Sequence, residues 1–474
     1  MQNHLKFYID GAWVDPADTK TLDVINPATE DAFARIALGN ASDVDKAVKA
    51  ARSAFADFSR WSVEDRVGLL ERILECYMAR FDDLVMAVSQ EMGAPVEFAR
   101  GSQVPVGASH IKSTLEALKT FSFSEARNKG LIVREPIGVC ALITPWNWPL
   151  NQIAAKVAPA IATGCTIVLK PSEIAPVSGI IFAEIMDAAG VPKGVFNLVN
   201  GNGPDVGQVM AGHPEVDMVS FTGSTRAGIL VAKTAADTVK RVCQELGGKS
   251  PNIVLRDADI EAAVEAGVRG CFDNSGQSCD APTRMLVPSE SHEKALAVAK
   301  RVAEALKTGD PTAKDTDLGP VVSQQQYDKI QGLITAAIDE GATLVTGGPD
   351  RPDGINRGYF VRPTVFGDVR NDMTIARQEV FGPVLSILPY ETEEEAIEIA
   401  NDTEYGLAAY VQGELEHARA VAMRLRAGNV SINDPDWDTA IPFGGYKQSG
   451  NGREFADFGM EDFLEIKGIR GFKA

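Results

Sequence analysis

The sequence has few of the features that mark membrane, disulfide-rich or zinc-binding proteins. No apolar run approaches the roughly 18 residues that span a bilayer, and no basic segment followed by an apolar block opens the chain. The 6 cysteines include no Cys-x-x-Cys pair and the 5 histidines stand singly. We therefore expect no disulfide framework, no zinc site or other metal, and a cytoplasmic location with reduced thiols.

Positive charge is also scarce. The chain has 46 Lys and Arg residues against 65 Asp and Glu residues, a formal net charge of -19. Such a charge repels nucleic acid and anionic lipid, and no basic stripe with interleaved aromatic residues offsets it. We expect no nucleic-acid partner and no membrane partner, and we interpret the acidic excess mainly as a solubilising surface.

What is present is a globular composition over 474 residues, enough for two or three domains. A short segment from Tyr8 to Gly11 predicts an edge strand and turn. Apolar residues at spacings of three and four then predict helices, with Ser42 as a cap and Pro105 as the site of a kink. The predicted helices cover residues 41–58, 63–80, 81–92 and 96–120.

From about residue 131, short apolar runs alternate with helix-length segments, a pattern typical of a parallel sheet with crossover helices. The runs predict strands over 139–144, 166–170, 195–199, 218–222 and 241–245. Ligands of such sheets bind where the strands end. The turn that contains Gly223 and Ser224 opens a helix there, so it suits a phosphate or, equally, an ordinary helix cap.

A second alternating region predicts a separate α/β domain. Its strands are expected near 252–255, 343–346, 359–365, 384–390, 408–412 and 429–432, with helices over 259–272, 292–307, 324–340, 393–401 and 415–426. Residues 463–469 alternate as a strand that has no partner of its own in this pattern. We therefore expect this strand to pair across a subunit interface.

One cysteine stands apart from the others by its neighbours. Cys279 lies among Asn, Ser, Gly, Gln and Pro residues, whereas Cys140 lies in an apolar run. This setting predicts an exposed thiol instead of a packed one. A lone cysteine in a loop is more often incidental than catalytic, so the remaining motifs must decide its role.

Seven motifs occur in a fixed order around this cysteine. They are Asn147 after the first parallel strand, Lys-Pro-Ser-Glu at 170–173, Phe-Thr-Gly-Ser-Thr at 221–225, Glu-Leu-Gly-Gly-Lys-Ser-Pro-Asn at 245–252, Cys279, Glu-Val-Phe-Gly-Pro-Val at 379–384, and Pro-Phe-Gly-Gly-Tyr-Lys-Gln-Ser-Gly at 442–450 with Gly-Arg-Glu at 452–454. This set resembles the hydrolytic, free-acid-forming branch of the NAD(P)-dependent aldehyde dehydrogenase superfamily and spans nearly the whole chain.

The resemblance implies a three-part α/β subunit. It consists of a Rossmann-like parallel-sheet cofactor domain, an α/β catalytic domain, and a small β oligomerisation element, and it assembles as a homodimer or homotetramer. On this chain the parts would be residues 1–120 with 136–245, residues 246–447, and residues 121–135 with 448–474, respectively.

The resemblance also implies the chemistry. Cys279 would attack an aldehyde, Asn147 and a main-chain N–H would hold the oxyanion, and the carboxylate of Glu245 would activate the water that hydrolyses the acyl thioester. A carboxylate at 245 favours release of a free acid over transfer to coenzyme A. A coenzyme A-acylating enzyme and a non-catalytic NAD-binding structural protein are the alternatives.

For the cofactor, the family pattern assigns the adenine ribose to Lys170 and Glu173 and the pyrophosphate to the Gly223-Ser224 turn. A carboxylate at Glu173 repels a 2′-phosphate, so we expect NAD in preference to NADP. The family pattern assigns the nicotinamide ribose to Glu379, and the other residues expected to line the cofactor cleft are Phe381, Trp146 and Ile143.

The positions of the family's substrate tunnel are Trp148, Gln152, Ser278, Asp280, Trp437 and Phe443. They include no arginine, so we expect an aromatic or medium-chain aliphatic aldehyde in preference to a carboxylated one. An aminoaldehyde or betaine aldehyde, held by cation–π contacts and Asp434 or Asp436, is the alternative. Gln244 and Asp280 depart from the commoner pattern, and Asp280 is expected to raise the pKa of the adjacent thiol.

Overall fold

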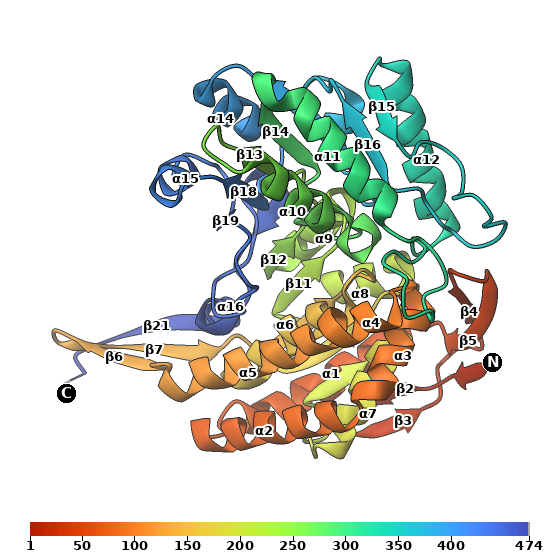
Figure 1. Cartoon of the computed structure of the whole chain (residues 1–474). Helices are drawn as coiled ribbons and strands as arrows, with labels where there is room; N and C mark the ends of the chain where they lie inside the picture. Colours follow the sequence, from red (N-terminus) through yellow and green to blue (C-terminus); the bar gives the residue numbers. More distant parts are fainter. Residues whose placement is uncertain (473–474) are drawn as a thin grey trace.

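The computed structural model describes residues 1–472 and consists of two α/β bodies and a projecting arm of strands (Figure 1). Residues 473–474, the end of the predicted oligomerisation segment, lie outside the described residues. None of the helices in residues 1–472 is long and apolar enough to cross a membrane.

Helices dominate the first body between residues 41 and 120. Small strands β1 (Gln2–His4), β4 (Thr21–Asn26) and β5 (Asp31–Ala37) pair with one another beside them. The helices that follow are α1 (Ala41–Phe58), α2 (Val63–Ala79), α3 (Phe81–Met92), α4 (Val96–Phe98) and α5 (Val104–Thr120). Their positions agree with the predicted ranges except within 96–120.

The predicted cap of the first helix is wrong, and the helix predicted over 96–120 is not continuous. Asn40, not Ser42, caps α1: its side-chain oxygen accepts the Ser42 N–H at 2.8 Å, and its own N–H donates to Asp43 at 3.1 Å. The helix predicted over 96–120 is interrupted by a π-helical turn at Ala99–Gln103, and Pro105 lies in the first turn of α5. A proline is tolerated in a first turn, and a π-helical turn is a common site of a helix kink, so a kink near Pro105 stays a prediction.

Eight strands of the described chain form the sheet of the first body, in the order β20-β12-β11-β8-β9-β10-β2-β3. Five of them are parallel: β8 (Val139–Ile143), β9 (Thr166–Lys170), β10 (Phe196–Leu198), β11 (Met218–Thr222) and β12 (Arg241–Glu245). Antiparallel β2 (Phe7–Ile9) and β3 (Ala12–Val14) follow, with β3 at the edge. The predicted strand and turn over residues 8–11 are therefore confirmed, but the prediction that this strand is the edge strand is wrong.

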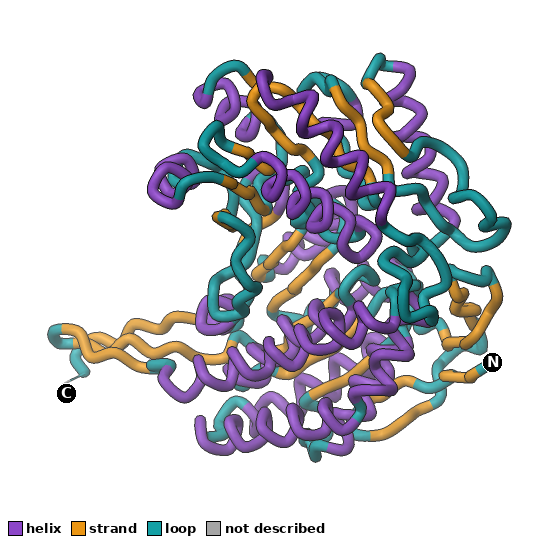
Figure 2. Tube along the Cα trace, in the orientation of Figure 1, coloured by secondary structure: helices purple, strands orange, loops and turns teal. Residues whose placement is uncertain are grey.

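Crossover helices cover both faces of this sheet (Figure 2). They are α6 (Pro149–Thr163), α7 (Val177–Ala188), α8 (Gln208–Gly212) after a π-helical turn at Gly203–Gly207, and α9 (Thr225–Ala235). The parallel strands are buried on both faces, with apolar clusters on either side. Ile143 of β8 lies opposite Phe221, and Thr222 opposite Glu245, so β8, β11 and β12 end at one edge.

The second body contains a sheet in the order β15-β16-β17-β14-β13-β18-β19, seven strands within residues 1–472. The strands are β13 (Pro251–Val254), β14 (Arg284–Pro288), β15 (Thr343–Thr346), β16 (Thr364–Gly367), β17 (Val384–Tyr390), β18 (Ala408–Gln412) and β19 (Asn429–Ile432). Their helices are α10 (Ile260–Phe272), α11 (His292–Ala305), α12 (Gln324–Asp339), α13 (Thr374–Arg377), α14 (Glu393–Asn401) and α15 (Leu415–Ala422). The central strand β14 is absent from the prediction.

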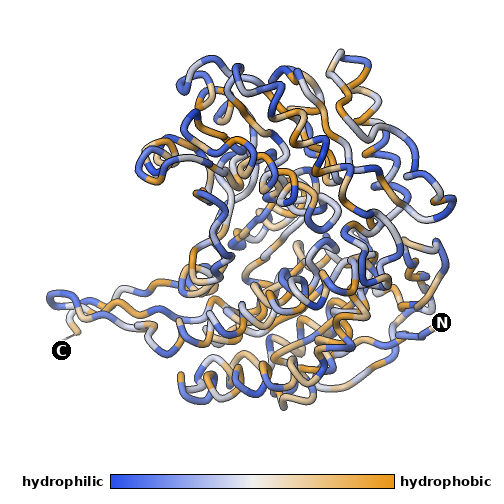
Figure 3. The backbone as a smooth tube through the Cα atoms, in the orientation of Figure 1, coloured by the Kyte–Doolittle hydropathy of each residue, from blue (hydrophilic) through white to orange (hydrophobic). Residues whose placement is uncertain are grey.

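The arm is a sheet of β6 (Ser124–Arg127), β7 (Gly130–Pro136) and β21 (Leu464–Arg470), reached through the short β20 (Gly450–Asn451) and α16 (Ala456–Asp462). β21 pairs antiparallel with β7 over its whole length. The prediction that the terminal strand lacks a partner in its own chain is therefore wrong. The arm extends away from both bodies (Figure 1). Apolar segments gather inside the bodies, whereas the tip of the arm is hydrophilic (Figure 3).

Candidate active site

Cys279 lies in a loop that leads from α10 into β14 and is fixed by its own hydrogen bonds. Ser275 Oγ donates to the Gly319 carbonyl at 2.9 Å, and Gln277 Oε1 accepts the Val322 N–H at 2.9 Å. At Gly276, where φ is 71°, a Cβ would come within 2.1 Å of the Gly382 carbonyl oxygen, so the turn requires glycine. The loop thus holds the thiol in one place.

The thiol is half-buried, not fully exposed as its polar neighbours predict. It packs against a small apolar cluster of Ala155, Leu407, Phe443 and Phe455. Burial raises the pKa of Cys279 well above its ordinary value, and the charges of Asp280, Glu379 and Glu245 raise it further. The thiol is therefore protonated at neutral pH in this state of the molecule.

Two cavities meet at this cysteine. One has a volume of about 190 Å³ and the other about 410 Å³, and among the described residues Cys279 alone lines both. The smaller cavity is also lined by predicted site residues Trp146, Asn147, Gly223, Ser224, Glu379 and Phe381. The larger one is lined by Trp148, Gln152, Asp280, Trp437 and Phe443. A molecule in either cavity can reach the thiol.

Asn147 follows β8 and lies beside the thiol loop. Its side-chain Nδ2 donates to the Gln277 carbonyl at 3.0 Å. Its own carbonyl accepts from Gln103 Nε2 at 3.0 Å and from Asn274 Nδ2 at 2.9 Å. An amide carries two N–H groups, so the bond to Gln277 leaves one free for an oxygen near Cys279.

Glu245 ends β12 and is buried, but it lines neither cavity. Neither of its carboxylate oxygens has a hydrogen-bond partner within residues 1–472. Burial raises the pKa of Glu245 well above its ordinary value and the nearby charge of Glu454 adds to this, while Lys156 and Arg453 act in the opposite direction. Lys156 and Glu454 form a buried ion pair. Glu245 is thus a carboxylate with unused acceptor capacity and increased basicity.

The smaller cavity is bounded by aromatic rings and a buried carboxylate. Trp146 and Phe381 meet edge to face, with ring centroids 5.3 Å apart. Glu379 Oε1 accepts the Gly248 N–H at 3.0 Å, and burial raises the pKa of Glu379. Ser224 Oγ accepts the Ala227 N–H at 3.3 Å, so its side chain caps α9, which satisfies the helix-cap interpretation.

Three of the predicted cofactor residues, Lys170, Glu173 and Ile143, do not line this cavity. Lys170 Nζ donates to Glu173 Oε2 at 3.0 Å and to the Pro171 carbonyl at 3.0 Å, at the end of β9. Ile143 ends the adjacent strand β8. The ends of β8 and β9 nevertheless lie beside the cavity, because the two strands are parallel neighbours in the sheet.

Aromatic side chains form part of the wall of the larger cavity. Phe443 and Phe455 stack with centroids 5.3 Å apart, and Trp437 lies 5.9 Å from each. Trp148 Nε1 donates to Ser278 Oγ at 2.8 Å, so Ser278 orients the indole and does not itself line the cavity.

Several lining residues were not among the predicted ones. Glu454 and Phe455 adjoin the Gly-Arg-Glu motif at 452–454, which was a signal for them. Asp273 precedes the thiol loop and could have been found by its position. Pro145, Thr222, Leu246 and Gly247 of the smaller cavity lie in or beside the strand-end motifs, and Asn151 of the larger one precedes the predicted Gln152. The other lining residues lie on helical segments distant from these motifs: Gln326 and Lys329 in the smaller cavity, and Gly101, Ser102, Pro105, Val106 and Ser109 in the larger.

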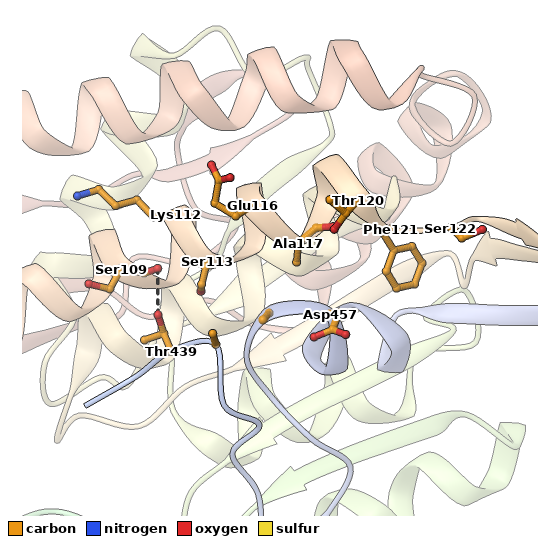
Figure 4. Close-up of a pocket in the computed structure, with 12 residues that line it drawn as sticks. Ser109, Lys112, Ser113, Glu116, Ala117, Thr120, Phe121, Ser122, Thr439 and Asp457 are labelled. Atoms are coloured by element: carbon orange, nitrogen blue, oxygen red, sulfur yellow. Dashed lines mark hydrogen bonds between the residues drawn. The ribbon is translucent and has the colours of Figure 1, made fainter. Parts of the chain in front are cut away.

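A third hollow, a groove of about 800 Å³, lies outside the larger cavity between α5, the loop at 434–441 and the start of α16 (Figure 4). Ser109 lines both the groove and the cavity. The Thr439 hydroxyl donates to the Ser109 carbonyl at 3.4 Å, as drawn in Figure 4. The loop therefore separates the groove from the cavity, with Trp437 on the inner side.

The fold and this pair of cavities agree with a known family. The chain matches the model of the aldehyde dehydrogenase family over residues 13–469, and it belongs to that family. The predicted family and fold class are confirmed.

Particular relatives cover the whole chain. A 3-succinoylsemialdehyde-pyridine dehydrogenase of a Pseudomonas species is 54% identical over 475 residues, covering 100% of both chains. The structure of an aldehyde dehydrogenase C mutant from Pseudomonas syringae in complex with NAD+ and octanal is 54% identical, with a TM-score of 0.98 over 99% of this chain and 97% of that one. A betaine aldehyde dehydrogenase mutant from Staphylococcus aureus in complex with NAD+ is 38% identical, with a TM-score of 0.95 over 98% and 96%.

Proposed function

We propose that this aldehyde dehydrogenase oxidises a neutral aldehyde, aromatic or medium-chain aliphatic, to its carboxylic acid with NAD. The observation that carries the proposal is the position of Cys279 at the meeting point of a cavity bounded by strand-end turns and a second cavity with aromatic walls. A thiol that is reached from both sides can bind an aldehyde from one cavity while the hydride leaves toward the other.

The smaller cavity suits a nicotinamide dinucleotide by its chemistry. Its turns follow the carboxyl ends of parallel strands, where such ligands bind. The Glu379 carboxylate offers acceptors for ribose hydroxyls, and the N–H groups at the start of α9 suit a pyrophosphate. The Lys170–Glu173 pair would hold the adenine ribose, and Glu173 would disfavour a 2′-phosphate. When bound, NAD supplies the hydride acceptor.

The chain's own groups perform the remaining steps. Cys279 loses its proton to solvent and its sulfur bonds to the aldehyde carbon, while the free N–H of Asn147 and a main-chain N–H hold the resulting oxyanion. Loss of hydride from that carbon leaves an acyl thioester on Cys279. Glu245 then takes a proton from water, and the hydroxide adds to the thioester carbon. The C–S bond breaks, Cys279 regains a proton from Glu245, and the carboxylic acid departs.

The aromatic walls favour a neutral substrate. Trp148, Trp437, Phe443 and Phe455 offer apolar contact, and the lining of the larger cavity within residues 1–472 contains no lysine, arginine or histidine. The names of two relatives, with octanal as a bound aldehyde and a pyridine-bearing semialdehyde as a substrate, agree with a medium-chain or aromatic preference. The acidic residues of the cavity favour an aminoaldehyde or betaine aldehyde as the second candidate.

A substrate panel tests the proposal. Purified protein with NAD and aldehydes of varied ring content, chain length and charge is assayed by NADH absorbance, with Cys279→Ala as the inactive control. We expect turnover of octanal and benzaldehyde without added coenzyme A, and a higher kcat/KM with NAD than with NADP. Absence of NADH with every aldehyde would overturn the proposed function, and a rate that depends on coenzyme A would overturn the hydrolytic mechanism.

For the assembly, we propose a homodimer or homotetramer formed through the arm. β21 lies at the edge of its sheet, and Ile466 on it has 72% of its surface exposed. An exposed strand edge with an exposed aliphatic side chain suits pairing with a second copy. The molar mass in solution, measured by light scattering, tests this expectation: a monomer at micromolar concentration would contradict it.

A further inference from the structure

The larger cavity has an unusual charge distribution. Three carboxylic residues line it, Asp273, Asp280 and Glu454. Glu454 is paired with the buried Lys156. Asp273 and Asp280 form no ion pair with a lysine, arginine or histidine anywhere in the described chain. Two uncompensated carboxylic groups therefore face the space in which the substrate would lie.

Both groups are held in place by the thiol loop. Asp273 opens the short turn that precedes the cysteine, and Asp280 follows it directly. The Tyr410 hydroxyl on β18 donates to the Asp280 carbonyl at 3.1 Å, which fixes the backbone beside the thiol. Arg269, the base whose charge acts on Asp273, is bonded to Glu265 at 3.0 Å. The loop geometry thus keeps these carboxylic groups at the cavity wall without a cation.

Burial of an unpaired carboxylic group has an energetic consequence. Burial raises the pKa of Asp280, which is half-buried by its exposed area. The pKa of Asp273 is raised as well, by loss of hydration at the cavity wall and by the Asp280 charge, although part of Asp273 is open to solvent. The site therefore disfavours more negative charge, whichever of the two groups is ionised. A carboxylate on the substrate would meet this negative wall and find no basic partner among the lining residues.

We propose that Asp280, supported by Asp273, determines the charge specificity of the aldehyde cavity by excluding aldehydes that end in a carboxylate and admitting neutral or cationic ones. The inference rests on the proposed aldehyde oxidation, because it concerns the same site. A cationic end group would gain from both carboxylic groups and from the faces of Trp148 and Trp437. A neutral end group is not subject to the repulsion.

The experiment compares three aldehydes of similar length: pentanal, succinate semialdehyde and 4-trimethylammoniobutanal. The kcat/KM of each is measured with NAD for the wild type and for Asp280→Asn, which removes the charge and keeps the shape. Asp280 also raises the pKa of the Cys279 thiol, so the variant changes every rate. The ratios of kcat/KM between two aldehydes cancel this shared effect. They isolate the contribution of the charge at the end of the aldehyde that is remote from the carbonyl.

In Asp280→Asn we expect the ratio of succinate semialdehyde to pentanal to rise at least about ten-fold, and the ratio of the cationic aldehyde to pentanal to fall several-fold. Asp457→Asn, the same change in the outer groove of Figure 4, should leave both ratios unchanged. Asp280→Glu, which restores the charge, should return them toward wild type.

Unchanged ratios in Asp280→Asn, with pentanal still oxidised, would overturn the inference and leave the proposed function intact. Absence of NADH with any of the aldehydes in the wild type would instead overturn the proposed function. If Asp280→Asn does not fold, Asp273→Asn takes its place, with smaller shifts of both ratios in the same directions. Unchanged ratios in that variant would again overturn the inference.

Discussion

Among single residues, Cys279 has the most unusual surroundings, because a nucleophile that must ionise lies near three carboxylic side chains. Burial, Asp280, Glu379 and Glu245 all raise the pKa of its thiol. Each of these groups has another reason to be present in the proposed mechanism. Burial is the main cause of the low thiolate fraction, and the three carboxylic groups around the sulfur lower the fraction further.

This setting predicts the pH dependence of the thiol. Thiolate is the reactive form, and a raised pKa moves its formation to higher pH, so alkylation of Cys279 by iodoacetamide should accelerate about ten-fold per pH unit through pH 8.5 without levelling off. Mass spectrometry of the modified peptide at several pH values measures the rate. Cys279→Ala supplies the background from the partly buried Cys76 and Cys243. A plateau below pH 8 would contradict the prediction.

Replacing Glu245 should separate hydride transfer from hydrolysis of the thioester. Glu245→Gln keeps the size of the side chain but removes the proton acceptor, so the first hydride transfer should proceed and hydrolysis of the thioester should stall. We expect about one equivalent of NADH per site in a burst, and a steady-state kcat lower by about 10²-fold or more.

Mass spectrometry of the intact protein should then detect an acyl group on the Glu245→Gln variant. Glu398→Gln on the exposed face of α14 is the matched control and should turn over normally. Normal steady-state turnover in Glu245→Gln would reject its role as the base.

Among the elements, helix α7 depends on a side chain from another helix. Glu91 of α3 is fully buried and accepts the Ser178 N–H at 3.1 Å and the Val177 N–H at 2.5 Å, in the first turn of α7. Burial raises the pKa of Glu91 to about 7, although these hydrogen bonds oppose the shift. Glu91 supplies the cap that α7 lacks in its own sequence.

The sign of the effect on stability follows from linkage. The folded protein holds a proton on Glu91 that the unfolded chain releases at lower pH, so this residue's contribution to the free energy of unfolding is full below about pH 4.5 and is lost as the pH rises through about 7. The loss is on the order of 3 kcal/mol. Glu91→Gln cannot titrate, so the difference in Tm between wild type and variant should decline from pH 5 to pH 8. A constant difference would contradict this account.

Much of the element order could be predicted from periodicity. β9, β11 and β12 have their predicted bounds because short apolar runs between turns are typical of strands buried on both faces. β14 escaped the prediction because it begins with Arg284, which is fully buried. Its guanidinium donates to the carbonyls of Lys249 and Ala400, each at 3.0 Å. Those acceptors are distant in sequence, so no local sequence pattern indicates that the guanidinium has hydrogen-bond partners.

The site was predictable where it lies in motifs and not where it depends on packing. The strand-end turns around Asn147 and Gly223 converge because β8 and β11 are neighbours in register. The contribution of α12 to the smaller cavity depends on how the second body packs against the first. Within the second body, Gln326 Nε2 donates to the Phe381 carbonyl at 2.8 Å, and this contact joins segments 55 residues apart, so no local pattern predicts it.

At the scale of the whole molecule, the arm is the feature with the least internal support. It projects from both bodies, and its sheet has only β6, β7 and β21 within the described chain (Figure 2). A three-stranded sheet standing away from the core buries little apolar surface, so its stability benefits from a partner. The pairing of β21 with β7 closes one edge of each strand and leaves the other edge of β21 available.

The last prediction concerns this free edge. Ile466→Asp places a charge at the most exposed aliphatic position of β21 without removing any strand pairing inside the chain. If two copies meet through the arm, the buried charge should weaken association by about ten-fold or more, because an unpaired carboxylate in an interface is costly. Light scattering across a dilution series measures the molar mass. Leu344→Asp, at an exposed aliphatic residue on β15 at the far side of the molecule, is the control (Figure 1). Equal molar masses for both variants and the wild type at every concentration would place the interface elsewhere.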